Sequence, residues 1–195
     1  MRIVTWNVKG LRSPEKRLMV LRQLKRLKAD IALLQETRLV EGEWNRMRKL
    51  WVGSVHGSSA NGRSSGVITL IHKSLPHKVL SLAPDEEGRL LQMTIDTPCG
   101  LLEVFDVYGP NDDNRDFFMK LETRLATQTT GIHMVGGDFN SVVDQDIDRS
   151  RDLTSQKQPQ KSSQDNTLGT FIESTRSVDS WRYLHPDGEG VFFLF

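Results

Sequence analysis

The 195-residue chain has very little cysteine, with Cys99 as its single thiol. One thiol cannot form an internal disulfide, which excludes a disulfide-stapled secreted domain and indicates a reducing compartment. The sequence also lacks any apolar run approaching 18 residues, and Trp6 and Asn7 interrupt the first apolar residues. These absences argue against a membrane span and against a secretory signal peptide. We therefore expect an intracellular protein with no membrane partner.

The chain also lacks a strong charge of either sign, because 26 Lys and Arg residues face 25 Asp and Glu residues. The net charge of +1 does not by itself indicate a polyanionic partner, but the charges are unevenly distributed. Nine basic residues and one acid lie between Arg2 and Lys28, whereas residues 138–152 are rich in aspartate. A basic face beside an acidic pocket suits an enzyme acting on DNA, because phosphate neutralisation supplies much of the affinity. The alternative is that the basic residues are only the solvated face of one helix.

Alternating apolar residues predict that the chain begins with a strand over residues 2–8. Ser13 and Pro14 are a typical helix start, with serine as the N-cap and proline in the first turn. A leucine stripe then continues this helix to about Lys28. The short apolar run Ile31–Leu34 follows as a buried strand. Strand, helix and strand within so little sequence indicate a crossover unit.

Turn residues divide the middle of the chain. The segment 52–65, rich in glycine, serine and asparagine, is expected to be an exposed loop. Beyond it, short turns that suit antiparallel hairpins separate four expected strands, at residues 66–72, 78–82, 89–95 and 101–108. A helix bearing Phe117, a strand over 132–135 and a helix near 168–173 follow, with a long polar loop over 148–165. The mixture of connections predicts one α/β domain of two packed mixed sheets with outer helices.

Several apolar runs end on a carboxylate or an amide. They are the runs before Asn7, Glu36, Asp138 and Asn140. Hard oxygen ligands of this kind suit Mg²⁺, which binds one or two carboxylates and keeps waters and substrate phosphates in its other positions. The two glycines before Asp138 let backbone approach a substrate closely, and Asn140 lies on the same side of an extended segment. Each residue also has an ordinary interpretation, as a strand-end acid, a turn-capping aspartate or a buried amide.

These residues lie in an ordered set of motifs that resembles the endonuclease/exonuclease/phosphatase superfamily and, within it, the apurinic-type endonuclease domain of LINE retrotransposons. The motifs are Ile3–Leu11, Ile31–Leu39, Val107–Asn111, Gly136–Ser141, Asp148–Ser150 and Asp179–Pro186. Any one of them is weak, but the ordered set extends over nearly the whole chain. The resemblance implies a single α/β domain over residues 1–195, a four-layer sandwich of two mixed β-sheets flanked by helices.

The resemblance also implies roles for the candidate residues. Glu36 and Asn7 would hold Mg²⁺, with Mn²⁺ as an alternative ion, and Asp138 and Asn140 would complete the ligand set. Asp138 would also orient the attacking water or protonate the leaving oxygen, and Asn140 would contact the phosphate. Tyr108 would contact the phosphate, either donating to a developing oxyanion or being ionised beside it; the alternative is a half-buried aromatic. Further contacts to phosphate or DNA are expected from Asn111, Lys9 and Arg12.

One departure from the family concerns the C-terminal end. The family's domain continues past the aromatic run Phe192–Phe195 to another strand and a terminal Ser-Asp-His motif, whose Asp and His belong to the active site. None of the five histidines lies in such a motif. The resemblance therefore implies a C-terminally incomplete domain with its last strands missing. An unpaired apolar strand edge would also make the protein poorly soluble.

Three functions remain open at this point. The first is Mg²⁺-dependent nicking of DNA by a retrotransposon-type, exonuclease III-like enzyme, acting as a monomer in the nucleus. The second is an abasic-site repair endonuclease. The third is a catalytically dead remnant that binds DNA. Nicking of supercoiled plasmid with Mg²⁺ or with EDTA would separate nuclease from remnant.

Overall fold

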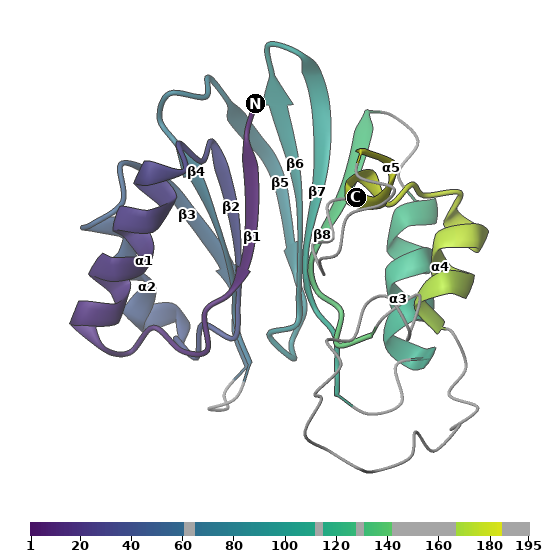
Figure 1. Ribbon diagram of the computed structural model, residues 1–195, viewed down its shortest axis with the longest axis horizontal. Coiled ribbons are helices and arrows are strands. Elements are labelled where there is room, and N and C mark those ends of the chain that lie inside the picture. The colour runs from purple at the N-terminus through teal and green to yellow at the C-terminus, as the bar shows by residue number, and fades with distance from the viewer. Residues whose placement is uncertain (61–64, 112–114, 128–130, 142–166, 185–195) are drawn as a thin grey trace.

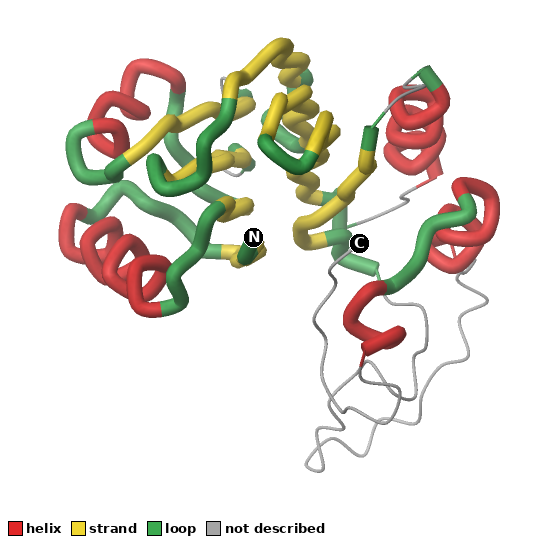
Figure 2. The backbone as a smooth tube through the Cα atoms, turned by 90° about the horizontal axis from the view of Figure 1, so that it is seen from above, coloured by secondary structure: helices red, strands yellow, loops and turns green. Residues whose placement is uncertain are grey.

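The computed structural model describes residues 1–60, 65–111, 115–127, 131–141 and 167–184. Two four-stranded sheets pack face to face, and helices cover their outer faces (Figure 1). The view from above shows the same layers, with helices on both sides of the paired sheets (Figure 2). The expected four-layer α/β architecture is therefore confirmed.

The first sheet, sheet A, has the strand order β1-β2-β4-β3. Its strands are β1 (Ile3–Asn7), β2 (Ile31–Gln35), β3 (Gly53–Ser58) and β4 (Val67–His72). Helix α1 (Pro14–Arg26) connects the parallel strands β1 and β2, and its N-cap Ser13 accepts a hydrogen bond from the Lys16 backbone N–H at 3.3 Å. The predicted crossover unit is therefore present, with proline and serine in the places expected at a helix start.

The second sheet, sheet B, has the order β5-β6-β7-β8. Its strands are β5 (Lys78–Pro84), β6 (Leu90–Thr97), β7 (Gly100–Tyr108) and β8 (Ile132–Asp138). The first three form an antiparallel meander, and β8 then pairs parallel to β7 after the crossover helix α3 (Arg115–Ala126). Helix α4 (Thr167–Thr175) lies beside α3, and α5 (Ser180–Leu184) follows it.

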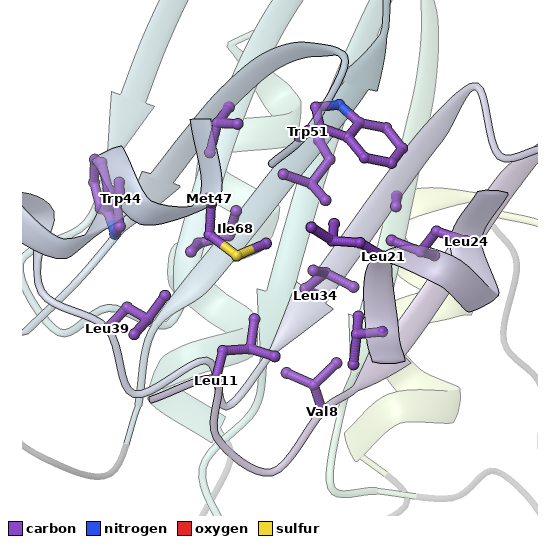
Figure 3. Packing of buried hydrophobic residues seen from close by; sticks show 14 of the residues in the cluster. Val8, Leu11, Leu21, Leu24, Leu34, Leu39, Trp44, Met47, Trp51 and Ile68 are labelled. Atoms are coloured by element: carbon purple, nitrogen blue, oxygen red, sulfur yellow. The ribbon is translucent and has the colours of Figure 1, made fainter. Parts of the chain in front are cut away.

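Three apolar clusters hold these layers together. Between α1, the short helix α2 (Trp44–Arg48) and sheet A, side chains such as Leu24 and Met47 are completely buried (Figure 3). A second cluster fills the space between the sheets. The third packs α3 and α4 on sheet B, where Phe118 stacks on Phe139 with ring centroids 6.2 Å apart. Full burial of one such side chain stabilises the fold by roughly 1.5–3 kcal/mol before entropy is counted.

Two sequence predictions about the middle of the chain are wrong. Residues 52–65 were expected to be a loop, but β3 occupies much of this segment, with Val55 buried opposite Leu70. Its Gly57 is required by packing, because a Cβ there would lie 2.8 Å from the Val67 carbonyl oxygen and 3.0 Å from the Trp44 ring. The expected hairpin between β4 and β5 is also absent, since the turn between them passes from one sheet to the other.

Two further expectations lie outside the described residues, namely the polar loop over 148–165 and the aromatic run at 192–195. The short helix α2 and the preceding 3-10 turn, Glu41–Glu43, were not predicted. Within the described ranges, no helix is long and apolar enough to cross a membrane.

Candidate active site

The candidate site lies where the two sheets bring the ends of their parallel strands together. In sheet A, Asn7 pairs in register with Gln35, so Glu36 follows directly at the strand end. In sheet B, Tyr108 is in register with Asp138. The side chain of Asn7 joins the two sheets, because its Nδ2 donates to Glu36 Oε1 at 2.9 Å and to Asp138 Oδ2 at 2.7 Å. Two carboxylates from different sheets thus converge on one amide.

Glu36 is held more tightly than a typical surface acid. It adopts the left-handed backbone region with φ +50°, and its side chain is only 16% exposed. Oε2 accepts a hydrogen bond from Arg38 Nη2 at 2.9 Å. Burial alone would raise the pKa of Glu36, but hydrogen bonds from Asn7, Arg38 and Tyr108, together with the charge of Arg38, lower it. The carboxylate therefore stays ionised at neutral pH.

Asp138 is fixed through both of its oxygens. Oδ2 accepts from Asn7, and Oδ1 accepts from the backbone N–H of Asn140 at 3.0 Å. The two preceding glycines, which were expected to let backbone approach a substrate, have a packing role in the structure. A Cβ on Gly137 would lie 1.9 Å from the Val107 carbonyl oxygen, and one on Gly136 would lie 2.7 Å from a methyl of Leu33. They let β8 approach β7 and sheet A closely, which brings Asp138 to Asn7.

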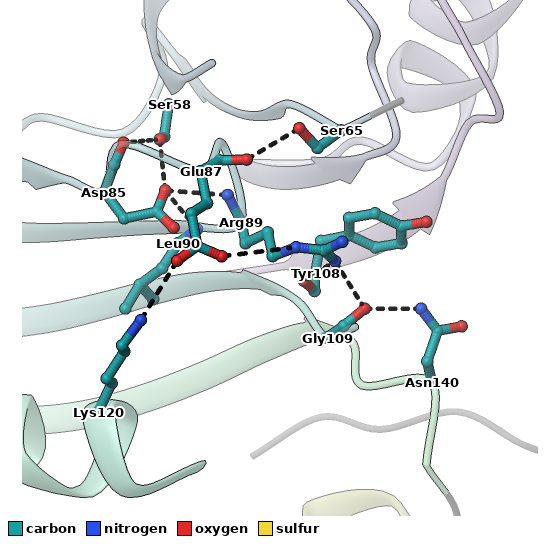
Figure 4. A network of polar contacts seen from close by, with 10 residues as sticks. All are labelled: Ser58, Ser65, Asp85, Glu87, Arg89, Leu90, Tyr108, Gly109, Lys120 and Asn140. Carbon is teal, nitrogen blue, oxygen red and sulfur yellow. Dashed lines mark hydrogen bonds and ion pairs between the residues drawn. The ribbon is translucent and has the colours of Figure 1, made fainter. Parts of the chain in front are cut away.

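Tyr108 faces Glu36 from the end of β7. Burial, the Glu36 charge and the hydrogen bond to Glu36 raise the pKa of the phenol, and they outweigh Arg89 and Asn140, which lower it. Arg89 lies against the tyrosine ring, with its guanidinium carbon 5.2 Å from the ring centroid, and Nη1 donates to the Gly109 carbonyl oxygen at 3.1 Å (Figure 4). The phenol is therefore a neutral hydrogen-bond donor, and the alternative of an ionised tyrosine is disfavoured.

Asn140 lies beside Tyr108 but does not continue the strand. It adopts φ +48°, so the expected extended segment ends after Asp138. Its Nδ2 donates to the Gly109 carbonyl oxygen at 2.7 Å, and its side chain also hydrogen-bonds to Tyr108. Figure 4 shows Arg89 and Asn140 meeting at Gly109 from opposite sides. The structure thus groups the Asn140 side chain with Tyr108, while its backbone N–H contacts Asp138.

The three outer candidates differ in how they relate to this cluster. The Lys9 backbone N–H donates to Asn7 Oδ1 at 3.0 Å, while its side chain is exposed. Arg12 Nε donates to the Arg38 carbonyl oxygen at 3.1 Å and so supports the segment that carries Arg38. Asn111 is exposed and makes no hydrogen bond or ion pair within the described part of the chain. Lys9 and Arg12 therefore lie at the rim of the site.

Most of the remaining basic residues of the N-terminal stretch do not form one face with Lys9 and Arg12; the exception is Lys16, whose Nζ donates to the Lys9 carbonyl oxygen at 2.9 Å. Arg17 is buried, and its Nη1 donates to the carbonyl oxygens of Leu11 and Arg12 at 2.8 and 2.6 Å. Arg22, Lys25 and Lys28 lie toward the far end of α1, which runs back along sheet A (Figure 1). The basic stretch is therefore divided between a structural arginine, the rim of the site and the opposite end of the sheet.

A second polar cluster lies directly beneath the first. The Asp106 carboxyl is completely buried between the sheets and accepts from Gln35 Nε2 at 2.8 Å and from Thr69 Oγ1 at 3.0 Å. Burial raises the pKa of Asp106 to about 8, although Gln35, Thr69 and the Leu34 backbone all hydrogen-bond to it. The group is therefore mostly protonated at neutral pH.

This buried cluster is positioned to align the site above it. Gln35 immediately precedes Glu36, and Asp106 lies two residues before Tyr108 on the same face of β7. The Gln35–Asp106 hydrogen bond therefore joins the two sheets in the layer just beneath the contact between Glu36 and Tyr108. Asp106 was not predicted from the sequence, although an acid inside the apolar run of β7 was a usable signal. Arg38 was likewise not predicted to have a role.

The ligand chemistry of the site fits a hard divalent cation. Glu36 and Asp138 supply carboxylate oxygens, and Mg²⁺ typically uses one or two of these, leaving its other positions to water and phosphate. Among the described residues no group of three or more His, Cys, Asp or Glu side chains gathers as a metal cage. The NH₂ group of Asn7, rather than its oxygen, faces the two carboxylates, so the amide would have to rotate to become a ligand.

The chain belongs to the endonuclease/exonuclease/phosphatase family, whose profile matches residues 4–187. It is 26% identical to an exodeoxyribonuclease of Bacillus subtilis (strain 168), over 98% of this chain and 79% of that protein. This places the protein among the relatives of known phosphodiester-cleaving enzymes. The match is distant, and nothing in it indicates a LINE origin.

Solved structures support the same fold. An AP endonuclease from Leishmania major superposes with a TM-score of 0.67 at 21% identity, covering 96% of this chain and 70% of that one. An AP endonuclease from Archaeoglobus fulgidus also gives a TM-score of 0.67, at 20% identity, covering 97% and 76%. The two mixed four-stranded sheets with outer helices of this chain therefore match the fold of these two structures.

Proposed function

We propose that this protein is a divalent-metal-dependent phosphodiester hydrolase that cuts DNA. The observation that carries the proposal is the single amide of Asn7, which holds a carboxylate from each sheet within 2.9 Å. Two hydrogen-bonded acids brought together across the interface between the two sheets suit a cation site, because a hard divalent cation such as Mg²⁺ binds through one or two carboxylates. The exodeoxyribonuclease relative supports DNA as the substrate.

In this proposal the residues divide the chemistry between them. Glu36 and Asp138 hold the metal, Mg²⁺ or Mn²⁺, which when bound neutralises charge on the phosphate as a Lewis acid. Asp138, fixed by the Asn140 backbone, also orients the attacking water or protonates the leaving oxygen. Tyr108, kept neutral by burial and by Glu36, donates a hydrogen bond to a phosphate oxygen. Asn140 provides a second amide beside it, and the rim cations Lys9 and Arg12 attract the DNA backbone.

Two DNA substrates are candidates, intact duplex DNA and duplex DNA with an abasic site. Similarity to two AP endonuclease structures favours abasic-site cleavage, whereas the motif order favours a retrotransposon-type nicking enzyme. Both use the same cluster of residues and the same reaction. They differ in the DNA that reaches it, so substrate comparison separates them.

The test uses the full chain on two DNA substrates, a supercoiled plasmid and a duplex with one abasic-site analogue. Each is incubated with Mg²⁺, with Mn²⁺ or with EDTA. We expect metal-dependent cleavage that the Glu36→Gln variant loses and the control Glu43→Gln variant keeps. Glu43 is a suitable control because its carboxylate pairs with Arg46 at 2.8 Å, away from the strand-end cluster. Faster cleavage of the abasic duplex would identify a repair-type specificity.

Binding without metal-dependent cleavage would contradict the hydrolase proposal. In that case the wild type and Glu36→Gln would retain both substrates equally in a gel-shift assay and would release no product. Such a result would identify the chain as a DNA-binding remnant of the family.

A further inference from the structure

A second pocket lies at the end of sheet A opposite the candidate site. It has a volume of about 490 Å³. Asp30, which borders it, directly precedes β2, whereas Glu36 directly follows that strand. The length of β2 therefore separates the pocket from the candidate catalytic residues, and a role in phosphodiester cleavage does not account for it.

The floor of this pocket is apolar and partly open to solvent. Leu18, Leu50 and Val52 are 40%, 42% and 50% exposed, although all three are aliphatic. Beneath them lie Leu21 and Trp51, which belong to the buried cluster of α1 and sheet A (Figure 3). Isolated exposed leucines are ordinary, but several that gather over one hollow resemble a binding surface.

Trp51 gives the floor a fixed shape. Its Nε1 donates to the Ile71 carbonyl oxygen at 3.1 Å, and its ring meets the His72 ring edge-on at a centroid distance of 5.5 Å. The indole is only 8% exposed. It supports the aliphatic side chains above it but offers no open ring face on which a nucleic-acid base could stack.

The rim of the pocket is positively charged. Arg22, Lys25 and Lys28 are exposed and form no ion pair within the described part of the chain. The one acid among the lining residues, Asp30, is outnumbered by these three cations, and its oxygens accept hydrogen bonds from other groups. Oδ2 accepts from the Arg2 backbone N–H at 2.7 Å, and Oδ1 accepts from Ser74 Oγ at 3.4 Å. Three cations from one stretch of chain, residues 22–28, thus border an apolar hollow.

We propose that this pocket docks a short acidic segment of a partner protein that carries bulky aliphatic or aromatic side chains. Apolar side chains of the segment would fill the hollow over Trp51, and its carboxylates would face Arg22, Lys25 and Lys28. The observed combination favours a peptide over a nucleic acid, because phosphates would use the cations but leave Leu50 and Val52 uncovered. Charge complementarity at such a rim sets the choice of partner more than the affinity.

A display selection with a random-peptide library tests this proposal on the full chain. Peptides are selected on the wild type and then rebound to the Val52→Asp variant, which places a carboxylate in the floor. The matched control is Leu82→Asp, because Leu82 is an exposed aliphatic residue of β5, 47% exposed and in the other sheet. We expect the selected peptides to be rich in acidic and large apolar residues. Their affinity should fall about tenfold or more in Val52→Asp and stay within about twofold in Leu82→Asp.

A second pair of variants tests the charged rim. Lys25→Glu should weaken the selected peptides several-fold, whereas Lys78→Glu on β5 should not. Peptides that bind all variants equally, or a selection without acidic enrichment, would overturn the proposal. An oligonucleotide that binds the wild type, loses affinity in Lys25→Glu and binds Val52→Asp normally would instead identify a nucleic-acid surface. DNA cleavage by Val52→Asp should equal that of the wild type, so the outcome is independent of the proposed function.

Discussion

Two polar clusters join the sheets of this protein, and they meet at the end of β2, where Gln35 of the inner cluster directly precedes Glu36 of the outer one. In the outer cluster, Glu36 and Asp138 share the amide of Asn7 at the strand ends. In the inner cluster, Asp106 takes hydrogen bonds from Gln35 and Thr69 in complete burial. Both clusters pair carboxyl with amide groups that reach from one sheet to the other, and the inner one adds the hydroxyl of Thr69. Their chemistry differs because only the outer one is reached by solvent.

Solvent access determines the charge state of each cluster. Three donors and the Arg38 charge lower the pKa of Glu36, whereas burial raises the pKa of Asp106 to about 8. Glu36 is therefore an anion that a cation can bind, and the inner acid Asp106 is a neutral group that holds the sheets in register. The difference teaches that a carboxylate near the end of a strand indicates a metal site only where water also reaches it.

The largest effect is expected from Glu36→Ala, which removes one of the two outer carboxylates. Metal-dependent DNA cleavage should fall by about 10³-fold or more, because a Lewis-acid metal supplies several kcal/mol of charge stabilisation. The fold should persist, since Glu36 lies after β2 rather than in the core. Initial cleavage rates and circular dichroism measure the two outcomes. An unchanged rate in a folded variant would show that Glu36 holds no essential metal.

A smaller loss is expected from Tyr108→Phe, which keeps the ring against Arg89 but removes the hydroxyl. Cleavage should slow by about 10²-fold, the usual loss when one charge-stabilising donor is removed. Metal affinity should change little, and this distinguishes the variant from Glu36→Ala. Equal rates for Tyr108→Phe and wild type would make the tyrosine a packing residue only.

The inner cluster should appear as a pH dependence of stability. The pKa of Asp106 is higher in the folded protein than its ordinary value of 3.8, so the folded state keeps a proton that the unfolded state loses. Stability from this group is complete below about pH 4 and is lost as the pH rises toward 8. The slope is at most about 1.4 kcal/mol per pH unit. Urea unfolding of wild type and Asp106→Asn between pH 5 and 9 measures it.

The Asp106→Asn variant provides the contrast because asparagine stays neutral throughout. The difference in unfolding free energy between the two proteins should therefore shift in favour of Asp106→Asn as the pH rises, and level off above 8. A constant difference across this range would mean that Asp106 is ionised in the folded protein at neutral pH.

The smallest effect concerns Arg38→Ala. Arg38 is 44% exposed, and exposed ion pairs contribute about 0–1 kcal/mol. Its removal should raise the pKa of Glu36, so the acidic limb of the cleavage profile should move to higher pH. The rate on the plateau should change little. A profile that does not move would leave Asn7 and Tyr108 as the groups that set the ionisation of Glu36.

Much of the fold was predictable because local signals agreed with tertiary structure. The strand β1, the capped helix α1 and the strand β2 follow alternation, a Ser-Pro helix start and an apolar run. The strand β3 was missed because its glycines resemble a loop, although Gly57 is there for close packing. The turn after β4 gave no indication that the next strand joins the other sheet, because turn length does not specify a sheet.

The site was predictable only in part, for a related reason. Each strand-end residue follows an apolar run, so Asn7, Glu36 and Asp138 could be chosen as candidates from the sequence. Their convergence on one amide depends on how the two sheets pack, and no local pattern contains that. Asp106 was missed because a buried acid is expected to be rare, and its partners Gln35 and Thr69 come from distant parts of the chain.

The contrast between the two clusters is tested most directly by Mn²⁺ binding, followed by electron paramagnetic resonance in wild type, Glu36→Gln and Asp106→Asn. The account predicts that the wild type and Asp106→Asn bind the ion with equal affinity, and that Glu36→Gln binds it at least about tenfold more weakly. Equal binding by all three proteins would contradict the assignment of the outer cluster as a metal centre.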